Sequence, residues 1–258
     1  MEAYVAFKAG PMANSLTATG FVPYHTMVPS SSVSDVNAHI NAICPSTPDT
    51  RDAILKRQLM DPREAAIQLV PFAGGSDTSK CDRSSGTYAH DWSGTYCTLA
   101  VCATRPFSRG SIHIKSASPT EHPIIDPAYL THPLDVDVAA QAILHAQELV
   151  KTEPFASHLK SDENGNKIAQ PSMFIPKTLE EAKEHVHNHT VTEYHPIGTC
   201  TMLPKESGGV VGSNLKVYGT SNVRVSDASV FPLHVQGNIQ SLVYAVAERT
   251  ADLIKGRI

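Results

Sequence analysis

A histidine stands directly before a proline in the segment TEYHPIGTCTM, residues 192–202. The proline ring crowds the preceding backbone and disfavours helical geometry for His195, and Gly198 lets the chain turn or pack closely where a side chain would clash. We therefore expect His195 on a stiff, extended segment that points its imidazole in one direction. Such a histidine is suited to proton transfer, although an ordinary turn can carry the same pattern.

A second candidate lies at the start of the last helical pattern, GNIQSLVYAVAERTADLIKG, residues 237–256. Asn238 is predicted to be the N-cap of this helix, whose first amide groups and positive dipole end stabilise a negative charge placed before them. Gly237 would let a flat ligand approach the backbone closely. A glycine followed by an asparagine is also simply a good helix start.

Together, His195 and Asn238 point to one kind of reaction. They are 43 positions apart in the chain, one on an extended segment and the other at a helix tip, so both side chains can converge on one substrate hydroxyl. The imidazole would take the proton and the amide would hold the oxygen. This arrangement suits the oxidation of an alcohol, in which alkoxide character must develop before a hydride leaves.

The histidine-rich segment HVHNH is a weaker candidate for chemistry. It contains His185, His187 and His189, and the i, i+4 spacing is compatible with metal binding. An HExxH motif and a nearby set of carboxylates are both missing from its surroundings. We interpret the segment as a solvated helix face and predict no metal site.

Acidic and thiol side chains offer two further alternatives. Asp126, Asp135 and Asp137 could be imagined as an acid pair for hydrolysis, but a position near a helix start explains Asp135 better by capping or dipole pairing. Cys200 is interpreted as a small buried residue rather than a nucleophile. His234 lies four residues before Asn238 and could line the same pocket.

Composition argues against several classes of protein. The chain has 258 residues, 41% of them hydrophobic, with 21 basic and 25 acidic residues and a net charge of -4. The lack of a lysine- or arginine-rich block argues against nucleic acid or an anionic membrane as a partner. No apolar run approaches the roughly 18 residues that span a bilayer, and the N-terminus does not resemble a signal peptide, so we expect a cytoplasmic protein. Five cysteines without a C-x-x-C motif are expected to be reduced thiols.

Hydrophobic periodicity and turn residues predict the elements that position these side chains. Helices are predicted over 48–62, 134–152, 178–189 and 237–256, the third with Thr178 and Glu181 spaced as a capping box. Strands are predicted over 64–74, 95–104, 111–116 and 222–232, with the second and third as an antiparallel pair. The first 47 residues are expected to be extended and loop structure. The predicted fold class is α+β, a mainly antiparallel sheet flanked by helices.

The segment YHPIGTCTMLPKESGGVVGSNLKVYGTSNVRVSDASVFPLHVQGNIQSLVYAVAERTADLI, residues 194–254, resembles the C-terminal signature of the glucose–methanol–choline (GMC) oxidoreductases, most closely the fungal members. Looser resemblance extends upstream to RPFSRGSIHIKSASPTEHPIIDPAYLTHPLDVDV and AYVAFKAGPM, which are similar to parts of the family's substrate domain. The resemblance implies an FAD-dependent enzyme that oxidises the CH–OH group of an alcohol and passes a hydride to flavin N5. It leaves the alcohol unnamed, and oxidase and dehydrogenase both remain open.

Site residues follow from the resemblance position by position. It implies that His195 is the base for the substrate hydroxyl and that Asn238 is the second active-site residue, which is His in some members and Asn in others. Asp227 and Ala228 match residues beside the flavin, Ala228 through its backbone. Ile239 and Gln240 match contacts near the isoalloxazine ring, where the helix dipole would stabilise the anionic reduced flavin.

Two departures from the family pattern affect the interpretation. Gly212 stands where an acidic residue is usual, for which we expect only a local turn effect. More important, the strand–GxGxxG–helix motif that holds the FAD pyrophosphate is not found in this sequence. We therefore expect a C-terminal portion of such an enzyme, with a partial substrate-binding domain over 1–190 and a segment over 191–258 that carries the histidine and completes an FAD (Rossmann-like) domain whose N-terminal ADP-binding region is absent. A missing N-terminal half would then be a partner, and the alternative function is a non-catalytic remnant or interaction module.

Overall fold

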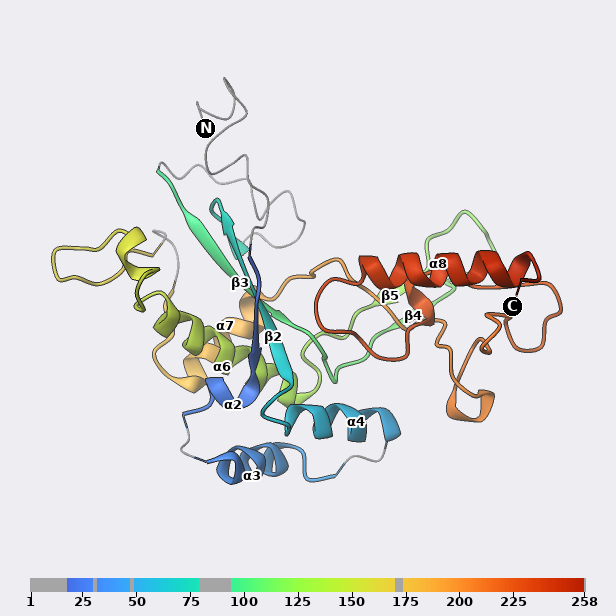
Figure 1. The fold of residues 1–258 in the computed structure, drawn as a ribbon, viewed down its shortest axis with the longest axis horizontal. Coiled ribbons are helices and arrows are strands. Elements are labelled where there is room, and N and C mark those ends of the chain that lie inside the picture. Colours follow the sequence, from blue (N-terminus) through green and yellow to red (C-terminus); the bar gives the residue numbers. More distant parts are fainter. Residues whose placement is uncertain (1–17, 30–31, 47–48, 79–93, 170–173, 258) are drawn as a thin grey trace, which may run out of the picture. The chain divides into compact units, whose positions relative to one another are not determined.

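A computed structural model describes residues 18–29, 32–46, 49–78, 94–169 and 174–257 of the chain (Figure 1). The chain divides into two compact units. Unit 1 consists of Met1–Ala103 and His132–Val191, and unit 2 consists of Thr104–Thr131 and Thr192–Ile258. Residues 104–131, which the sequence analysis placed with 1–190, therefore group with the C-terminal segment.

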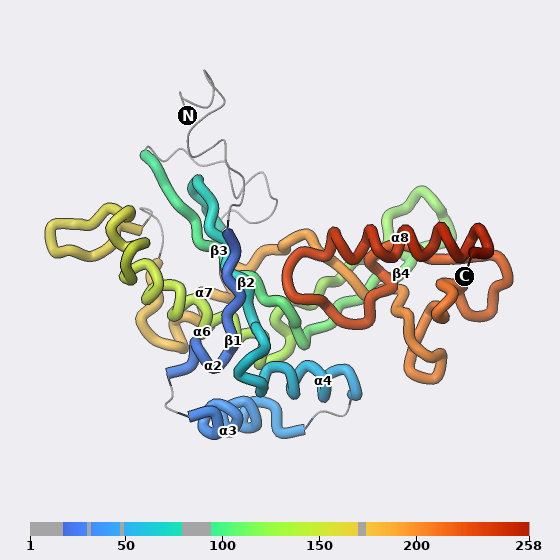
Figure 2. The backbone as a smooth tube through the Cα atoms, in the orientation of Figure 1, coloured from blue at the N-terminus to red at the C-terminus, as the bar shows by residue number. Residues whose placement is uncertain are grey.

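An antiparallel sheet forms the centre of unit 1. Its strands β1 (Gly20–Pro23), β2 (Ala65–Ala73) and β3 (Cys97–Ala103) lie side by side in that order (Figure 2). The first six residues of β2 are all buried, Gln68 among them, so both faces of this central strand are covered. Helix α6 (Pro133–Leu149) contacts β2 and β3, and α7 (Leu179–His189) contacts α6. The predicted antiparallel sheet flanked by helices is confirmed.

The helices begin where the sequence provides caps. The Ser32 hydroxyl caps α3 (Val33–Ile43), the Asp49 carboxylate caps α4 (Thr50–Leu59), and the predicted capping box of Thr178 and Glu181 is present at the start of α7. The four predicted helices are thus confirmed, the last as α8 (Gln240–Ile254). None of the described helices is long and apolar enough to cross a membrane.

Three expectations about local structure are wrong. Residues 18–47 are not simply extended, since they form β1, the short helix α2 (Tyr24–Met27) and α3; residues 1–17 lie outside the described part of the chain. The 95–104 strand pairs with β2, whereas β4 (Ser111–His113) pairs with β5 (Ile124–Asp126). The expected strand at 222–232 contains only a bridge from Lys216 to Arg224, followed by the 3-10 turn η5 (Ala228–Val230). The Asp227 side chain caps this turn, since it accepts a hydrogen bond from the backbone amide of Ser229.

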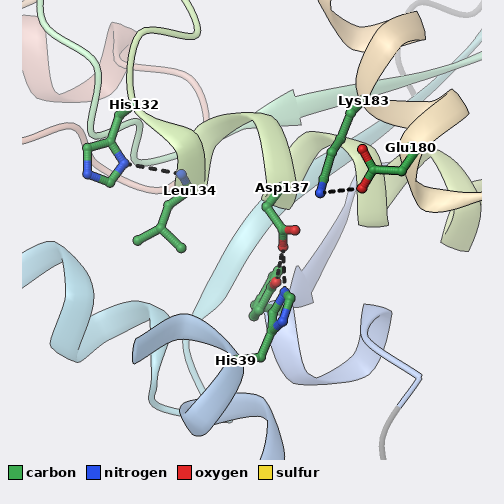
Figure 3. Close-up of polar contacts among 7 residues, drawn as sticks. His39, His132, Leu134, Asp137, Glu180 and Lys183 are labelled. Carbon is green, nitrogen blue, oxygen red and sulfur yellow. Dashed lines mark hydrogen bonds and ion pairs between the residues drawn. The ribbon is translucent and has the colours of Figure 1, made fainter. Parts of the chain in front are cut away.

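Asp137 is a carboxylate in the interior of unit 1, with 1% of its surface exposed. It points from α6 toward α3 (Figure 3), where His39 Nε2 lies 3.2 Å from Oδ2, and the same oxygen accepts a hydrogen bond from the Tyr24 hydroxyl. Burial, and then the charge of Asp137, raise the pKa of Tyr24 well above its usual range. Tyr24 is therefore a neutral donor at any ordinary pH, and it stabilises a charge that would otherwise be costly to bury. This pairing makes Asp137 a structural residue rather than a hydrolytic acid.

Replacement of Tyr24 by phenylalanine should weaken unit 1. The variant keeps the ring but removes the hydroxyl that donates to a buried carboxylate, so we expect the free energy of unfolding to fall by about 1.5–3 kcal/mol. Urea denaturation of the two proteins measures this change. Tyr244→Phe is the matched control, because the Tyr244 side chain is 66% exposed and its loss of a hydroxyl should leave stability unchanged. Equal effects of the two substitutions would contradict the role given to Tyr24.

His185 is the buried member of the histidine-rich helix face. It is 8% exposed, its ring stacks on His189 at a centroid distance of 4.1 Å, and its buried Nδ1 has no partner among the described residues. Burial, reinforced by the charge of His189, lowers the pKa of His185 below its usual value. The unfolded chain then binds a proton more readily than the folded chain, so acid favours unfolding through this residue.

The pH dependence of stability should therefore change when His185 is replaced. In the native protein, the contribution of His185 to the free energy of unfolding is constant above its pKa in the unfolded chain, about 6.5. This contribution is lost as the pH falls from there through the lower pKa of His185 in the folded chain. His185→Phe keeps an aromatic ring against His189 and should flatten the fall of the melting temperature between neutral and mildly acidic pH. His187→Phe, on the exposed side of the same helix, should keep the native profile. Identical profiles for both variants would contradict the assignment.

Candidate active site

A small apolar core holds the candidate site of unit 2 in place. It is formed by buried residues from the turn segments and from the start of α8, namely Val211, Leu215, Val230, Phe231 and Ile239. Apolar side chains of α8, including Leu242 and Val246, pack against it. Because Phe231 and Ile239 both belong to this core, the loop between them is anchored at its two ends.

The segment that carries His195 runs beside η5. The backbone amides of Cys200 and Met202 donate to the carbonyl oxygens of Ser229 and Val230 at 2.9 and 2.8 Å. Gly198 has a φ of 88°, and a Cβ at this position would lie 3.4 Å from the Phe231 carbonyl oxygen. The left-handed backbone is what favours a glycine here, since a Cβ at that distance would make an ordinary van der Waals contact.

The ring of His195 has a defined hydrogen-bonding arrangement. Its Nδ1 lies 2.5 Å from the carbonyl oxygen of Glu193, which can only accept a hydrogen bond. Nδ1 therefore carries a hydrogen, and in the neutral ring Nε2 is left with a lone pair. The preceding residue, Tyr194, has a φ of 63°, a left-handed conformation that is uncommon for a residue other than glycine and is frequent near functional sites.

Asn238 contacts the ring nitrogen that has the lone pair. Its Nδ2 lies 3.0 Å from His195 Nε2, so the amide donates to the imidazole. Gly237, with a φ of 78°, turns the chain just before it. The structure thus brings together the two residues that the sequence analysis predicted to converge, although they are 43 positions apart.

The position of Asn238 relative to the last helix differs from the prediction. The N-cap of α8 is Ile239 rather than Asn238. Ile239 is 8% exposed and belongs to the core, so packing determines where the helix begins. Asn238 lies one residue earlier, and its amide is directed to His195 instead of the helix amides.

The remaining predicted site residues lie around the same helix end. Asp227 is exposed and caps η5, Ala228 is half-buried against the core, and Gln240 is exposed as the first residue of α8. The side chain of Ile239 faces the core, so only its backbone is available to a ligand. The first turn of α8 contains no acidic residue, and Ile239 cannot cap it through a side chain. This end of the helix can therefore accept a negatively charged group.

His234 is a contact that the sequence indicated only by its position near Asn238. Its Nε2 lies 3.0 Å from the carbonyl oxygen of His195. The Glu193 carbonyl could not be found from residue types at all, because every residue has a carbonyl group.

Other features of the described residues do not add to this site. Within the described ranges there is no group of three or more His, Cys, Asp or Glu side chains that could hold a metal ion. An open hollow of about 720 Å³ in unit 1 is lined by residues of α3, α4 and the following turn, among them Asn41, Lys56, Arg57 and Arg63. None of the predicted site residues lines it.

Comparison with solved structures first identifies the class of protein. The structure of an FAD-dependent oxidoreductase from Chaetomium thermophilum has a TM-score of 0.71 and 25% identity, and the match covers 99% of this chain and 42% of that one. The family follows from the sequence, because residues 106–247 match the family model described as GMC oxidoreductase. The chain belongs to the GMC oxidoreductase family, as the resemblance implied.

Relatives of known description support this assignment. The dehydrogenase mpl7 of Monascus purpureus is 29% identical over 266 residues, covering 98% of this chain and 41% of that protein. An alcohol dehydrogenase (acceptor) of Pseudomonas putida is 34% identical over 161 residues, covering 62% of this chain and 28% of that protein. The chain thus spans about two-fifths or less of the length of these relatives.

Proposed function

We propose that this chain supplies the proton-accepting half of the active site of an FAD-dependent oxidoreductase that acts on the CH–OH group of an alcohol. The observation that carries the proposal is the contact of 3.0 Å between His195 Nε2 and Asn238 Nδ2, in a ring whose Nδ1 is tied to the Glu193 carbonyl. A base and a hydrogen-bond donor then lie side by side, as a substrate hydroxyl requires. Membership of the GMC family, with FAD-dependent and alcohol-oxidising relatives, supports this assignment.

The proton transfer follows from these two contacts. A substrate hydroxyl that displaces the direct hydrogen bond between the two side chains can accept a hydrogen bond from the Asn238 amide and donate its own hydrogen to His195 Nε2. When the proton moves to Nε2, the Nδ1–H bond to Glu193 holds the resulting imidazolium in place. The Asn238 donor meanwhile stabilises the negative charge that develops on the substrate oxygen. His195 is thus the general base, and Asn238 positions the alcohol.

The residues around the start of α8 fit a bound flavin. FAD, when bound, supplies the acceptor for the hydride that leaves the carbinol carbon. Asp227, Ala228, Gln240 and the backbone of Ile239 would hold it. The helix end has no acidic residue in its first turn, so the partial positive charge of the helix dipole favours the negative charge that the cofactor gains.

Replacement of His195 tests the proposed base. The test uses the flavin-loaded protein that contains this chain. The His195→Ala variant should still show the visible absorption of bound flavin. The rate at which an added alcohol bleaches this absorption should fall by about 10²–10⁴-fold. His187→Ala, on the exposed face of α7, is the matched control and should bleach at the native rate. If no alcohol reduced the flavin of the native protein, the non-catalytic alternative would be favoured. An unchanged rate of flavin reduction in His195→Ala would refute the assignment of the base.

Replacement of Asn238 tests the hydrogen-bond donor separately. Asn238→Leu has a similar size but no donor, and it should reduce the rate of alcohol-dependent flavin reduction by about 10²–10³-fold, as for the loss of one oxyanion donor. Asn238→His restores an N–H group and should recover most of the rate. Stopped-flow absorbance measures both variants. Equal losses in the two would show that shape, rather than donation, matters at this position.

A further inference from the structure

Both ring nitrogens of His234 face backbone carbonyl groups. Nε2 lies 3.0 Å from the carbonyl oxygen of His195, and Nδ1 lies 3.0 Å from the carbonyl oxygen of Val235. Carbonyl oxygens only accept and a neutral imidazole has one N–H, so a bond to His195 places the hydrogen on Nε2 and leaves Nδ1 without a hydrogen for Val235. His234 is half-buried, which protects this bond from competition with water.

The side chains of His234 and Val235 have different surroundings. Val235 packs against the apolar core of unit 2, so that residue is turned inward. The His234 ring is turned toward the segment that carries His195, as its Nε2 contact with the His195 carbonyl group shows.

The carbonyl group of His195 lies in a stretch with few other attachments. Pro196 has no backbone N–H to donate, and the next main-chain bond to η5 is made by Cys200. Within the described part of the chain, the bond from His234 is the only hydrogen bond that joins a main-chain group of residues 195–199 to another segment. Ile197 packs against the apolar core, but apolar packing does not fix the direction of the His195 carbonyl group as a hydrogen bond does.

We propose that His234 is a positioning residue for the general base, because its Nε2–H bond to the His195 carbonyl fixes the backbone from which the catalytic imidazole projects. The inference rests on the proposed function for its catalytic meaning. His234 and Asn238 belong to one loop and hold His195 at two points, the first at the main chain and the second at the ring. A single rigid loop, anchored by Phe231 and Ile239, thus sets both the position and the direction of the base.

The bond itself can be tested in the unsubstituted protein. In protein labelled with ¹⁵N and ¹³C, a scalar coupling across the hydrogen bond should connect His234 Nε2 to the carbonyl carbon of His195. This measurement needs no flavin and no activity. A His195 carbonyl that couples to no histidine nitrogen would overturn the inference, whether or not the proposed function is correct.

Two substitutions separate hydrogen bonding from bulk. His234→Gln keeps an N–H donor on a flexible side chain, whereas His234→Leu fills the space without a donor. The Leu variant should shift the ring ¹⁵N signals of His195 and lower kcat for alcohol-dependent flavin reduction by up to about 10²-fold, the effect of a displacement of about 1 Å, with little change in KM. The Gln variant should restore both.

Reference signals distinguish this result from a loss of structure. The ring signals of His185, in unit 1, should be the same in all three proteins, and His187→Leu should leave the His195 signals and kcat unchanged. Unaltered His195 signals in His234→Leu, or a Gln variant as impaired as the Leu variant, would refute the positioning role. If the native protein did not oxidise alcohols, only the proposed function would fail, since the coupling and the ¹⁵N shifts are read without turnover.

Discussion

The main-chain bonds between residues 200–202 and η5 are the constraint on which the candidate site depends. Cys200 and Met202 donate to the carbonyl groups of Ser229 and Val230, so two segments that are almost thirty positions apart in the chain are held in register. His195 precedes the paired residues in the chain, and the loop that leads to Asn238 follows them. The side chains of Val230 and Phe231 enter the apolar core, so that hydrophobic burial stabilises the pairing. The short distance between the base and the donor is a consequence of this arrangement.

Neutral groups make all the contacts described for the His195 ring. A backbone carbonyl fixes the Nδ1–H tautomer and an amide faces Nε2, and neither brings a formal charge. A carboxylate at Nδ1 would orient the ring equally well, but it would favour a protonated imidazole before substrate arrives. A carbonyl fixes the orientation without this added negative charge. The lone pair on Nε2 accepts from the Asn238 amide, and the substrate hydroxyl is proposed to take the place of this bond.

The parts of the fold that were predictable from sequence are those determined locally. The helices could be predicted because periodicity and caps such as Thr178 with Glu181 lie within a few residues of each other. Strand pairing was predicted less well, because the partner of β3 is β2, which precedes it by more than twenty residues, rather than the nearer β4. At the site, His195 and Asn238 were identifiable by residue type. The role of Glu193 was not, because it acts through a backbone carbonyl group that every residue has.

The N-cap of α8 is Ile239 rather than the predicted Asn238, and this difference of one residue matters for the proposed site. If Asn238 were the cap, its side chain would bond to the first amides of the helix, and both the asparagine and the positive helix end would be used for stability. Instead, the N-cap is Ile239, whose side chain is buried in the apolar core and cannot cap the helix amides. The burial of its side chain offsets the lost cap, which is worth about 1 kcal/mol. The Asn238 amide is then directed to His195, and the helix end is left without a side-chain cap at the point where a flavin is proposed to bind.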